Sequence, residues 1–532
     1  MKKNNLLKVL TISFLIFVVL CWLIPVGSFS NGSYSKGAVS PIGLYDLISN
    51  PMVAIGAYIS YGLLVLAIGG FYGVLSKAGV YDRLVEKYAK KYEGKENKFL
   101  VITIVLFTLL SSVTGATYAL LILVPLFIGI LTYMKYDKLT MLLATIGSIL
   151  MGNLAATYGF EVVGYINHYL GMNNMHNVIA AKVILLVVVT VLLSLFAIKN
   201  SKRNDDKKVA VKETKKTAKT EKVVSEKPVK KATKKTATKK ADTKKTTKKT
   251  TAKKTTKKKT TKKGTKAMAK AEKVIKVKNE KMVSLVPFMI IFGLFMIGLF
   301  VACYNWRYSF NVGLFEDIYE AVIGVKVKAL GDLAIFAGLL GSVNPFGYWS
   351  IAEITVALVY ATLVIGWVYS VKFGDMVEAF INGAKKLLPA AIYLTLAFVI
   401  TSVLVNAQSD GNIYNTFVNW TLGLTKGFNI FTVGLVSFVG GFFLNDMPYL
   451  VSSIASPLTT KITDSTLYPL VGLVMQTMHG LAMFVLPTSA ILIGGLAALE
   501  VPYKDWIKYI WKLLLQVFVV AIVICFTVAL FI

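Results

Sequence analysis

The chain has 532 residues, of which 55% are hydrophobic and 16% are charged. Soluble globular proteins carry roughly 25% charged residues, so this composition excludes an ordinary soluble enzyme and indicates an integral membrane protein. The net charge of +32 is concentrated in residues 201–281, which hold 33 Lys or Arg and 8 Asp or Glu. The high overall charge therefore describes one segment and not the whole protein.

The N-terminus resembles a signal peptide, because Lys2, Lys3 and Lys8 precede or border an apolar run. No small-x-small cleavage site follows that run, so we expect an uncleaved first transmembrane helix over residues 6–26. The three cysteines lie in or beside apolar runs and have no CxxC partner, which favours packing residues over disulfides or a zinc site.

Long apolar runs recur along the chain, and a helix needs about 20 apolar residues to cross the bilayer. Candidate segments occupy residues 6–26, 52–76, 99–134, 139–160, 178–198, 283–303, 351–371, 387–406, 429–460, 467–499 and 509–531. A further stretch, 331–345, is apolar but short, and we expect it at the outer interface.

The distribution of Lys and Arg between these segments predicts their orientation. Basic residues, almost all of them lysines, are frequent in 77–98, 372–386, 500–508 and above all 199–282, whereas 161–177 has none. We therefore expect a multi-pass protein of the plasma membrane. Its N-terminus and its lysine-rich segment would lie in the cytoplasm, and residues 161–177 would lie outside.

Two segments, 99–134 and 429–460, are too long for one crossing, and small or polar residues interrupt both. Residues 111–117 interrupt the first and residues 440–448 the second. We predict a re-entrant hairpin at each, because irregular backbone at mid-membrane depth is tolerated only within protein or beside a cavity. Segment 467–499 would span about 50 Å at ~1.5 Å per residue, so we expect it to break at Gly480 or at residues 486–489.

These elements predict an all-α polytopic fold with two inverted repeats, each with a re-entrant hairpin and an interrupted helix, and about nine full transmembrane helices. Residues 1–198 form the first repeat, 199–282 a cytoplasmic linker, 283–350 a connecting helix and outer loop, and 351–532 the second repeat. Inverted repeats with interrupted helices are typical of secondary transporters, whose site lies near the midplane between the interruptions.

The lysine segment, residues 212–267, consists of Lys/Thr/Ala repeats with no aromatic residue and no apolar period. Such a composition cannot form a core and predicts disorder. A solvated linker that also sets the topology is the simplest interpretation. The alternatives are a polybasic contact with anionic lipid or non-specific, salt-dependent contact with another polyanion.

Candidate site residues are the polar and helix-breaking residues of the interrupted segments. Free N–H groups at helix N-termini hold carboxylates, and a charge at mid-membrane depth is functional by default, which makes Asp446 the sharpest candidate. His479 could relay a proton or donate to a carboxylate. The predicted substrate- or ion-binding set is Ser111, Ser112, Thr114, Gly115, Thr117, Asn153, Thr157, Asn445, Asp446, Pro448, Gln476, His479, Pro487, Thr488 and Ser489.

Several other functions are disfavoured by the sequence. We expect no enzyme, because no nucleophile–base pair, metal cluster or phosphate loop is visible. We also expect no metal site and no cofactor, although Na⁺ or H⁺ could be a coupling ion. A membrane-anchored interaction protein acting through its lysine segment, and a channel, remain alternatives. No Lys or Arg is firmly placed in the membrane core, which favours a zwitterion or monocarboxylate over a fully ionised dicarboxylate.

Three stretches resemble one known family. They are GGFYGVLSKAGVYDRLVEKYAKKYEGKENK (69–98), AFINGAKKLLPAA (379–391) and LPTSAILIGGLAALEVPYKDWIKY (486–509). They are similar to the anaerobic dicarboxylate carrier family of the ion-transporter superfamily, and most of all to a branch often labelled basic amino-acid antiporters. The likeness covers roughly residues 6–198 and 283–532.

The resemblance implies an elevator-type secondary carrier, usually dimeric, for small carboxylates or amino acids, driven by an ion gradient or by exchange. The chain departs from this family at two places. Related sequences often have paired acidic residues near the first hairpin and an Asn-Pro pair in the next helix, whereas here residues 114–117 read Thr-Gly-Ala-Thr and residues 152–157 read Gly-Asn-Leu-Ala-Ala-Thr. The second hairpin has Asn445-Asp446-Met447-Pro448 where relatives tend to be rich in Ser and Gly.

Overall fold

The fold was analysed in a computed structural model that describes residues 5–203, 283–328, 331–406 and 411–532. The predicted lysine segment, 212–267, lies outside the described residues. The parts of the chain before and after it, 1–204 and 283–532, form one compact unit. The two halves that the sequence predicts as separate repeats therefore fold together.

The first half begins with helix α1 (Leu6–Leu23) and a short β-hairpin, β1 (Gly27–Ser30) and β2 (Ser33–Lys36). Nine α-helices and two π-helical turns follow among the described residues: α2 (Asp46–Lys77), α3 (Val80–Lys91), α4 (Glu96–Thr114), α5 (Thr117–Leu120), α6 (Val124–Tyr133), α7 (Lys138–Leu142), η1 (Leu143–Gly147), α8 (Ser148–Leu154), η2 (Phe160–Gly164), α9 (Tyr165–Tyr169) and α10 (Ile179–Asn200).

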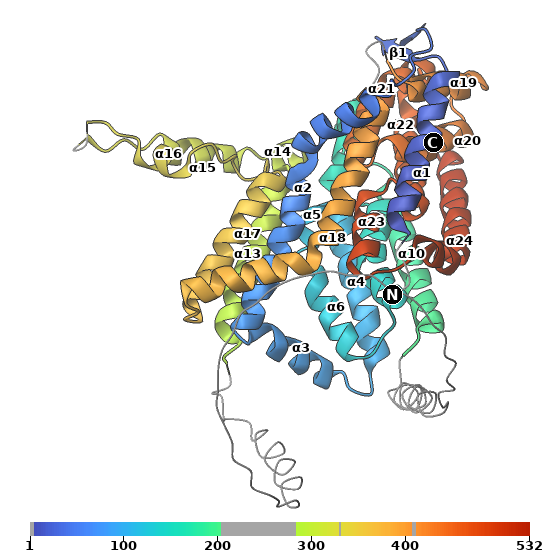
Figure 1. Cartoon of the computed structure of the whole chain (residues 1–532). Coiled ribbons are helices and arrows are strands. Elements are labelled where there is room, and N and C mark those ends of the chain that lie inside the picture. The colour runs from blue at the N-terminus through green and yellow to red at the C-terminus, as the bar shows by residue number, and fades with distance from the viewer. Residues whose placement is uncertain (1–4, 204–282, 329–330, 407–410) are drawn as a thin grey trace, which may run out of the picture. The chain divides into compact units, whose positions relative to one another are not determined.

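The second half is also helical (Figure 1). Its elements are α13 (Val286–Cys303), α14 (Trp306–Phe310), α15 (Leu314–Ile323), α16 (Ile335–Leu340), α17 (Ile351–Val368), α18 (Phe373–Asn406), α19 (Ile413–Gly423), α20 (Ile430–Phe443), α21 (Met447–Lys461), η4 (Ser465–Leu467), α22 (Tyr468–Val485), α23 (Ala490–Ala498) and α24 (Tyr503–Ala529). The β-hairpin of the first half lies at the end of the molecule occupied by α19, and the backbones of Gly27 and Asn412 exchange two hydrogen bonds there.

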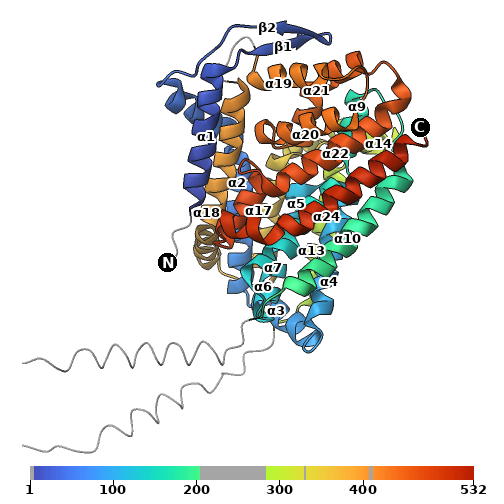
Figure 2. The same ribbon diagram turned by 90° about the vertical axis from the view of Figure 1, so that its right-hand side faces the viewer.

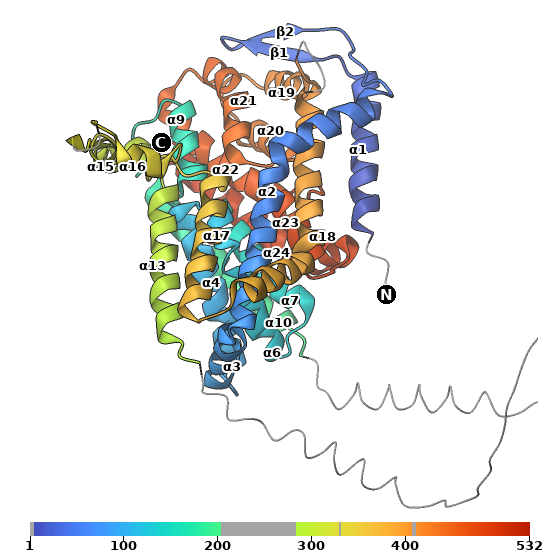
Figure 3. The same ribbon diagram turned by 60° about the vertical axis from the view of Figure 1, so that its left-hand side comes forward.

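Among the described residues, nine helical segments are long and apolar enough to cross a membrane. The chain is therefore an all-α polytopic membrane protein, as the sequence predicts. The nine candidate spans differ from the nine predicted ones in one place. Glu96–Thr114 is long and apolar enough to cross a membrane, whereas the helix in the predicted span 139–160 is shorter and ends at Leu154. Figures 2 and 3 show long helices running side by side, with α10 beside α24 and α13 beside α17.

Helix α18 corrects a predicted boundary. The sequence analysis places residues 372–386 in a loop because of their lysines, but the helix begins at Phe373. The segment has good helix formers and only one glycine between Met376 and Leu388, so local propensity supports a helix despite the charge. A positive-inside assignment locates the side of the membrane and does not locate the helix end.

Helices α2 and α18 cross at glycines, which lets their backbones approach closely. A Cβ atom added to Gly383 would lie 2.2 Å from the carbonyl oxygen of Gly69, and one added to Gly73 would lie 2.1 Å from that of Ala379. Small residues at such crossings are a common way for membrane helices to pack. This contact joins the two halves of the chain along much of their length.

The breaks fall close to their predicted positions. Helix α4 ends at Thr114, and the next residue, Gly115, has a left-handed φ of +67°. Residues 444–446 separate α20 from α21, and residues 486–489 separate α22 from α23. Gly480 is not a break, because it lies inside α22, where a side chain would collide with Leu154.

Candidate functional site

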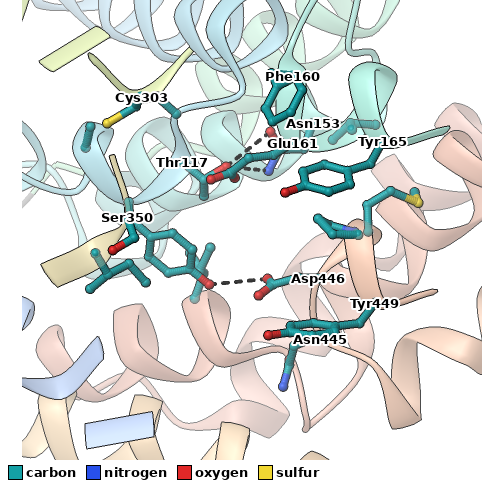
Figure 4. A pocket seen from close by; sticks show the side chains of 18 of the residues that line it. Thr117, Asn153, Phe160, Glu161, Tyr165, Cys303, Ser350, Asn445, Asp446 and Tyr449 are labelled. Carbon is teal, nitrogen blue, oxygen red and sulfur yellow. Dashed lines mark hydrogen bonds between the residues drawn. The ribbon is translucent and has the colours of Figure 1, made fainter. Parts of the chain in front are cut away.

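A cavity of about 700 Å³ lies where the three breaks converge. One wall comes from α5, α8, η2 and α9 of the first half, and a second comes from residues 445–452 together with α22 and α23. The third wall is formed by α2, residues 303–305 and residues 347–354. Figure 4 shows the polar side chains of these elements directed into the cavity.

The first break is held by one backbone carbonyl. The Ser112 carbonyl oxygen accepts hydrogen bonds from the amides of Thr157 (3.0 Å), Tyr158 (3.3 Å) and Gly159 (3.0 Å). The Ser112 hydroxyl donates to the carbonyl of Ala155 at 2.8 Å. The end of α4 therefore satisfies the backbone groups that are released where α8 stops.

Two glycines make this contact close enough. Gly115 and Gly159 face each other, and a Cβ atom added to Gly115 would lie 2.9 Å from the amide nitrogen of Phe160. The approach brings Glu161, at the start of η2, next to Thr117 at the start of α5 (Figure 4).

Asn153 is the polar centre of the first wall. Its amide nitrogen donates to the Thr117 hydroxyl at 3.0 Å, and its amide oxygen accepts from the Ser111 hydroxyl at 2.8 Å. Since the tip of α8 is held on both sides, the amide group of Asn153 has a fixed orientation at the cavity surface.

Asn445 fixes the second break in a similar way. Its amide nitrogen donates to the Thr401 hydroxyl of α18 at 2.9 Å, and its oxygen accepts from the Ala490 amide at 3.0 Å. The latter bond satisfies one of the free N–H groups at the start of α23. Nearby, a ring nitrogen of His479 lies 3.2 Å from the Leu444 carbonyl oxygen.

Two carboxylates face the cavity, one from each half of the chain. Asp446 is the residue before α21, and its carboxylate accepts a hydrogen bond from the Tyr118 hydroxyl at 3.2 Å. Glu161 comes from η2 on the opposite wall (Figure 4). The residues that line the cavity in the described chain include no Lys or Arg, so the cavity is acidic.

Gln476 connects the two halves behind this surface. Its side-chain nitrogen donates to the carbonyls of Leu154 (3.0 Å) and Ala156 (2.9 Å), which flank the end of α8. The side chain is buried and also borders the cavity. Movement of α22 would therefore displace the tip of α8.

The third wall is aromatic and polar. Tyr61 of α2 packs against Tyr118, with ring centroids 5.1 Å apart, and against Phe398, at 4.1 Å. The Tyr348 hydroxyl donates to Glu316 at 2.9 Å, and burial, together with this bond, raises the pKa of Tyr348.

The predicted site residues divide into two groups. Those that line the cavity are Thr117, Asn153, Asn445, Asp446, Pro448, Gln476, His479 and Ser489. Those that lie behind the surface are Ser111, Ser112, Thr114, Gly115, Thr157, Pro487 and Thr488. Their binding role stays a prediction. The Thr114 hydroxyl donates to the Leu110 carbonyl of its own helix, and the Thr488 hydroxyl donates to the Gly441 carbonyl.

Glu161, Tyr118 and Tyr61 are not among the residues predicted from the sequence. Glu161 is predicted in an outer loop because residues 161–177 contain no Lys or Arg. The usable signal was an isolated acidic residue between apolar residues directly after an interrupted helix, in the stretch Gly-Phe-Glu-Val-Val. The two tyrosines give no local signal, since aromatic residues are frequent throughout apolar helices.

Comparison with known proteins gives two family matches. The model of the C4-dicarboxylate anaerobic carriers matches residues 239–530, and that of the citrate transporters matches residues 6–341. None of the curated proteins compared with the chain matches it. The solved structure of the Alcanivorax borkumensis YdaH transporter covers 99% of this chain and 98% of its own at 10% identity, with a TM-score of 0.35.

The family matches agree with the apolar helices and with the resemblance seen in the sequence. Each spans more than half of the chain, and both describe carriers of carboxylates. Together they indicate an integral membrane carrier for small carboxylates and no enzyme. Residues 6–341 also match the citrate transporters. The chain belongs to the C4-dicarboxylate anaerobic carrier family and is a carboxylate- or citrate-type secondary transporter.

Proposed function

We propose that the chain is an elevator-type carrier of amino acids, with a preference for basic ones, and that the acidic cavity is its substrate site. The observation that supports this most is the pair of carboxylates, Asp446 and Glu161, in a cavity whose described lining has no basic side chain. A C4-dicarboxylate would add two more negative charges, and like charges in a partly dehydrated site repel strongly. A substrate with one or two ammonium groups balances the cavity.

The carboxylate end of an amino acid also has suitable partners. Helices α21 and α23 both begin at the cavity, and neither has a side-chain cap hydrogen bond from its own N-cap residue. Helix N-termini bind carboxylates through free N–H groups and the helix dipole. Asp446 lies at the same end of α21, so an α-carboxylate and an α-ammonium group could be held next to each other.

Aromatic rings support a cationic group at the same place. Tyr61, Tyr118, Tyr165 and Tyr449 line the cavity around the two carboxylates. Cations are attracted to the faces of such rings, and more strongly where water is excluded. An alternative follows from the names of the matching families: a carboxylate or citrate could enter together with Na⁺ or H⁺ bound at Asp446 and Glu161.

Counterflow in proteoliposomes separates these substrates. Vesicles are loaded in turn with C4-dicarboxylates, citrate, monocarboxylates, neutral amino acids and basic amino acids, and labelled solute is added outside. We expect transient accumulation with amino acids, largest with basic ones and independent of a Na⁺ gradient. Accumulation of dicarboxylates or citrate alone, and only with a Na⁺ or H⁺ gradient, would favour the alternative.

Charge-neutral variants test the role of the carboxylates. Asp446→Asn and Glu161→Gln should each abolish or strongly reduce counterflow, because each removes half of the charge that balances the substrate. Glu93→Gln, at an exposed position away from the cavity, is the matched control and should transport normally. Equal activity of all three variants would contradict the proposed site.

The elevator mechanism rests on the composition of the walls. Residues from α2, α13 and α17 face residues from α5, α8, η2, α21, α22 and α23 across the cavity, so a shift of one group against the other would change access. Helix α18 belongs with the first group through its contact with α2, and it touches α23 of the second.

A disulfide across this boundary tests the shift. A Cβ atom at Gly494 of α23 would lie 3.3 Å from the Cβ of Leu394 of α18, close to the ~3.5–4.5 Å of natural disulfides. Oxidation of Leu394→Cys/Gly494→Cys should stop transport reversibly, whereas either single variant should not respond. Full transport by the cross-linked protein would exclude movement between α18 and α23.

The remaining expectations from the sequence complete the proposal. The two hairpins would enter the membrane from opposite sides. The protein would be a homodimer in the plasma membrane, with the N-terminus and residues 212–267 in the cytoplasm. The lysine segment would contact anionic lipid or another polyanion. Deletion of residues 205–275 should then leave counterflow nearly unchanged. Loss of all transport in a folded deletion variant would favour an interaction protein that works through this segment.

A further inference from the structure

Residues 306–328 and 331–346 form an arm whose two outer helices, α15 and α16, leave their apolar side chains exposed or only half-buried. The arm, which comprises α14, α15 and α16, extends away from the helices on which it is mounted (Figures 1 and 3). None of the residues of α15 or α16 is buried. Leu339 is 75% exposed, and Leu314, Ile318, Leu333 and Phe336 are also exposed.

The arm is tied to the membrane surface by its position in the chain. It follows the candidate span Val286–Cys303 after two residues, and the next candidate span begins at Ile351. Two residues reach no more than about 7 Å, so the arm starts where these helices leave the apolar layer. It also runs across the direction of α13 and α17 (Figure 3).

The side chains of the arm are sorted by polarity. In α15, Glu316, Asp317 and Glu320 fall on one side of the helix, while Leu314 and Ile318 are one turn apart on another, as in a helix at a polar–apolar boundary. In α16 every residue is apolar or glycine. At the arm's base, aromatic rings pack together, including Trp306 with Phe315 and Phe346 with Trp349, which is typical of the interfacial belt of membrane proteins.

We propose that this arm lies in the boundary between lipid headgroups and acyl chains, with Leu339 and the other exposed apolar side chains inserted and the acidic side of α15 in water. The spans beside the arm also expose apolar side chains near it, among them Ile297 of α13 and Val356 of α17. Lys326 and Lys328 are exposed farther along the arm and can reach lipid phosphates. This inference is independent of the substrate proposed above.

Spin labels at two positions of the full chain test the inference. A label at Leu339→Cys reports the apolar side, and one at Glu320→Cys reports the acidic side of the same arm. Unmodified protein, which keeps Cys21, Cys303 and Cys525, serves as the blank. In phosphatidylcholine/phosphatidylglycerol nanodiscs, the Leu339 label should collide more with oxygen than with a water-soluble nickel chelate, and the Glu320 label should show the opposite order.

Three results would overturn the inference. Equal nickel access at both labels would place the arm in water. Protection of Leu339 with spin–spin broadening, lost on dilution with unlabelled protein, would instead identify a second copy of the chain as the partner. The same access in nanodiscs and in lipid-free amphipol would mean that protein and not lipid shields the label. Counterflow by both labelled variants controls for folding.

Discussion

Replacement of Gln476 by methionine offers a quantitative test of how the two halves are joined. The side chain is 1% exposed, and its nitrogen donates to two carbonyls at the end of α8, those of Leu154 and Ala156. Methionine is similar in length and offers no donor. The Gln476→Met variant therefore leaves two buried carbonyls without that donor, while the surrounding packing is largely preserved.

The expected cost follows from a count of unsatisfied groups. Each buried acceptor left unpaired costs about 1–3 kcal/mol. The substitution also removes the Gln476 side-chain oxygen, which is itself buried and has no hydrogen-bond partner among the described residues. The net change is one additional unsatisfied group, so the free energy of unfolding should fall by about 1–3 kcal/mol.

Thr477→Val is the matched control in the same turn of α22. The Thr477 hydroxyl is buried and donates to carbonyls of its own helix, those of Leu473 and Val474. These carbonyls lie within the helix and do not depend on the hydroxyl alone, so the loss should stay below about 1 kcal/mol.

The free energy of unfolding of both variants can be measured by circular dichroism in mixed micelles with an increasing fraction of dodecyl sulfate. We expect Gln476→Met to unfold at a clearly lower fraction than Thr477→Val. If the two variants unfold together, the bridge from α22 to the end of α8 contributes nothing to stability, and the proposed coupling between the halves is refuted.

Two further predictions concern packing and the acidic pair. Gly383→Ala should prevent folding or expression, because its Cβ would lie 2.2 Å from the Gly69 carbonyl oxygen. At Gly423 an added Cβ meets no atom within 4 Å, so Gly423→Ala should express normally. The yields of both variants can be measured by fluorescence-detected size exclusion, and equal yields would contradict the close contact. Tyr118→Phe removes the hydrogen bond to the Asp446 carboxylate. The variant should fold but bind substrate more weakly, which would raise the KM in counterflow. An unchanged KM would show that the hydrogen bond does not orient Asp446.

The sequence predicts features that depend on local composition. The breaks at residues 444–446 and 486–489 follow from polar and proline residues inside apolar runs, and the turn at Gly115 follows from a glycine between small residues. Such signals are local because the membrane penalises free backbone groups wherever they occur. The all-helical polytopic class is predicted for the same reason.

Features that depend on long-range contacts are not predicted. Glu161 belongs to the cavity only because the Ser112 carbonyl draws the chain after α8 toward α4, and the isolated segment reads as a loop. The length of α18 is missed for a different, local reason, because it depends on its helix formers more than on its lysines. Of the predicted ligands, Asn445, Asp446 and Ser489 line the cavity from the breaks, and Gln476 and His479 line it from inside α22. The hydroxyls of Ser112 and Thr488 donate to backbone carbonyls.

The three amides gathered by the Ser112 carbonyl have a consequence for how the chain can diverge. A carbonyl oxygen and an amide hydrogen are present whatever side chains the residues carry, so most substitutions at Tyr158 would leave this contact intact. Gly115 and Gly159, where an added Cβ would meet backbone at about 3 Å, constrain the local sequence, as does Gly152, where it would lie 2.4 Å from the Thr108 carbonyl oxygen. Distantly related chains could thus keep this geometry although most side chains around it differ. Gly115 and Gly159, two glycines 44 positions apart, would then be the sequence feature by which such relatives can be recognised.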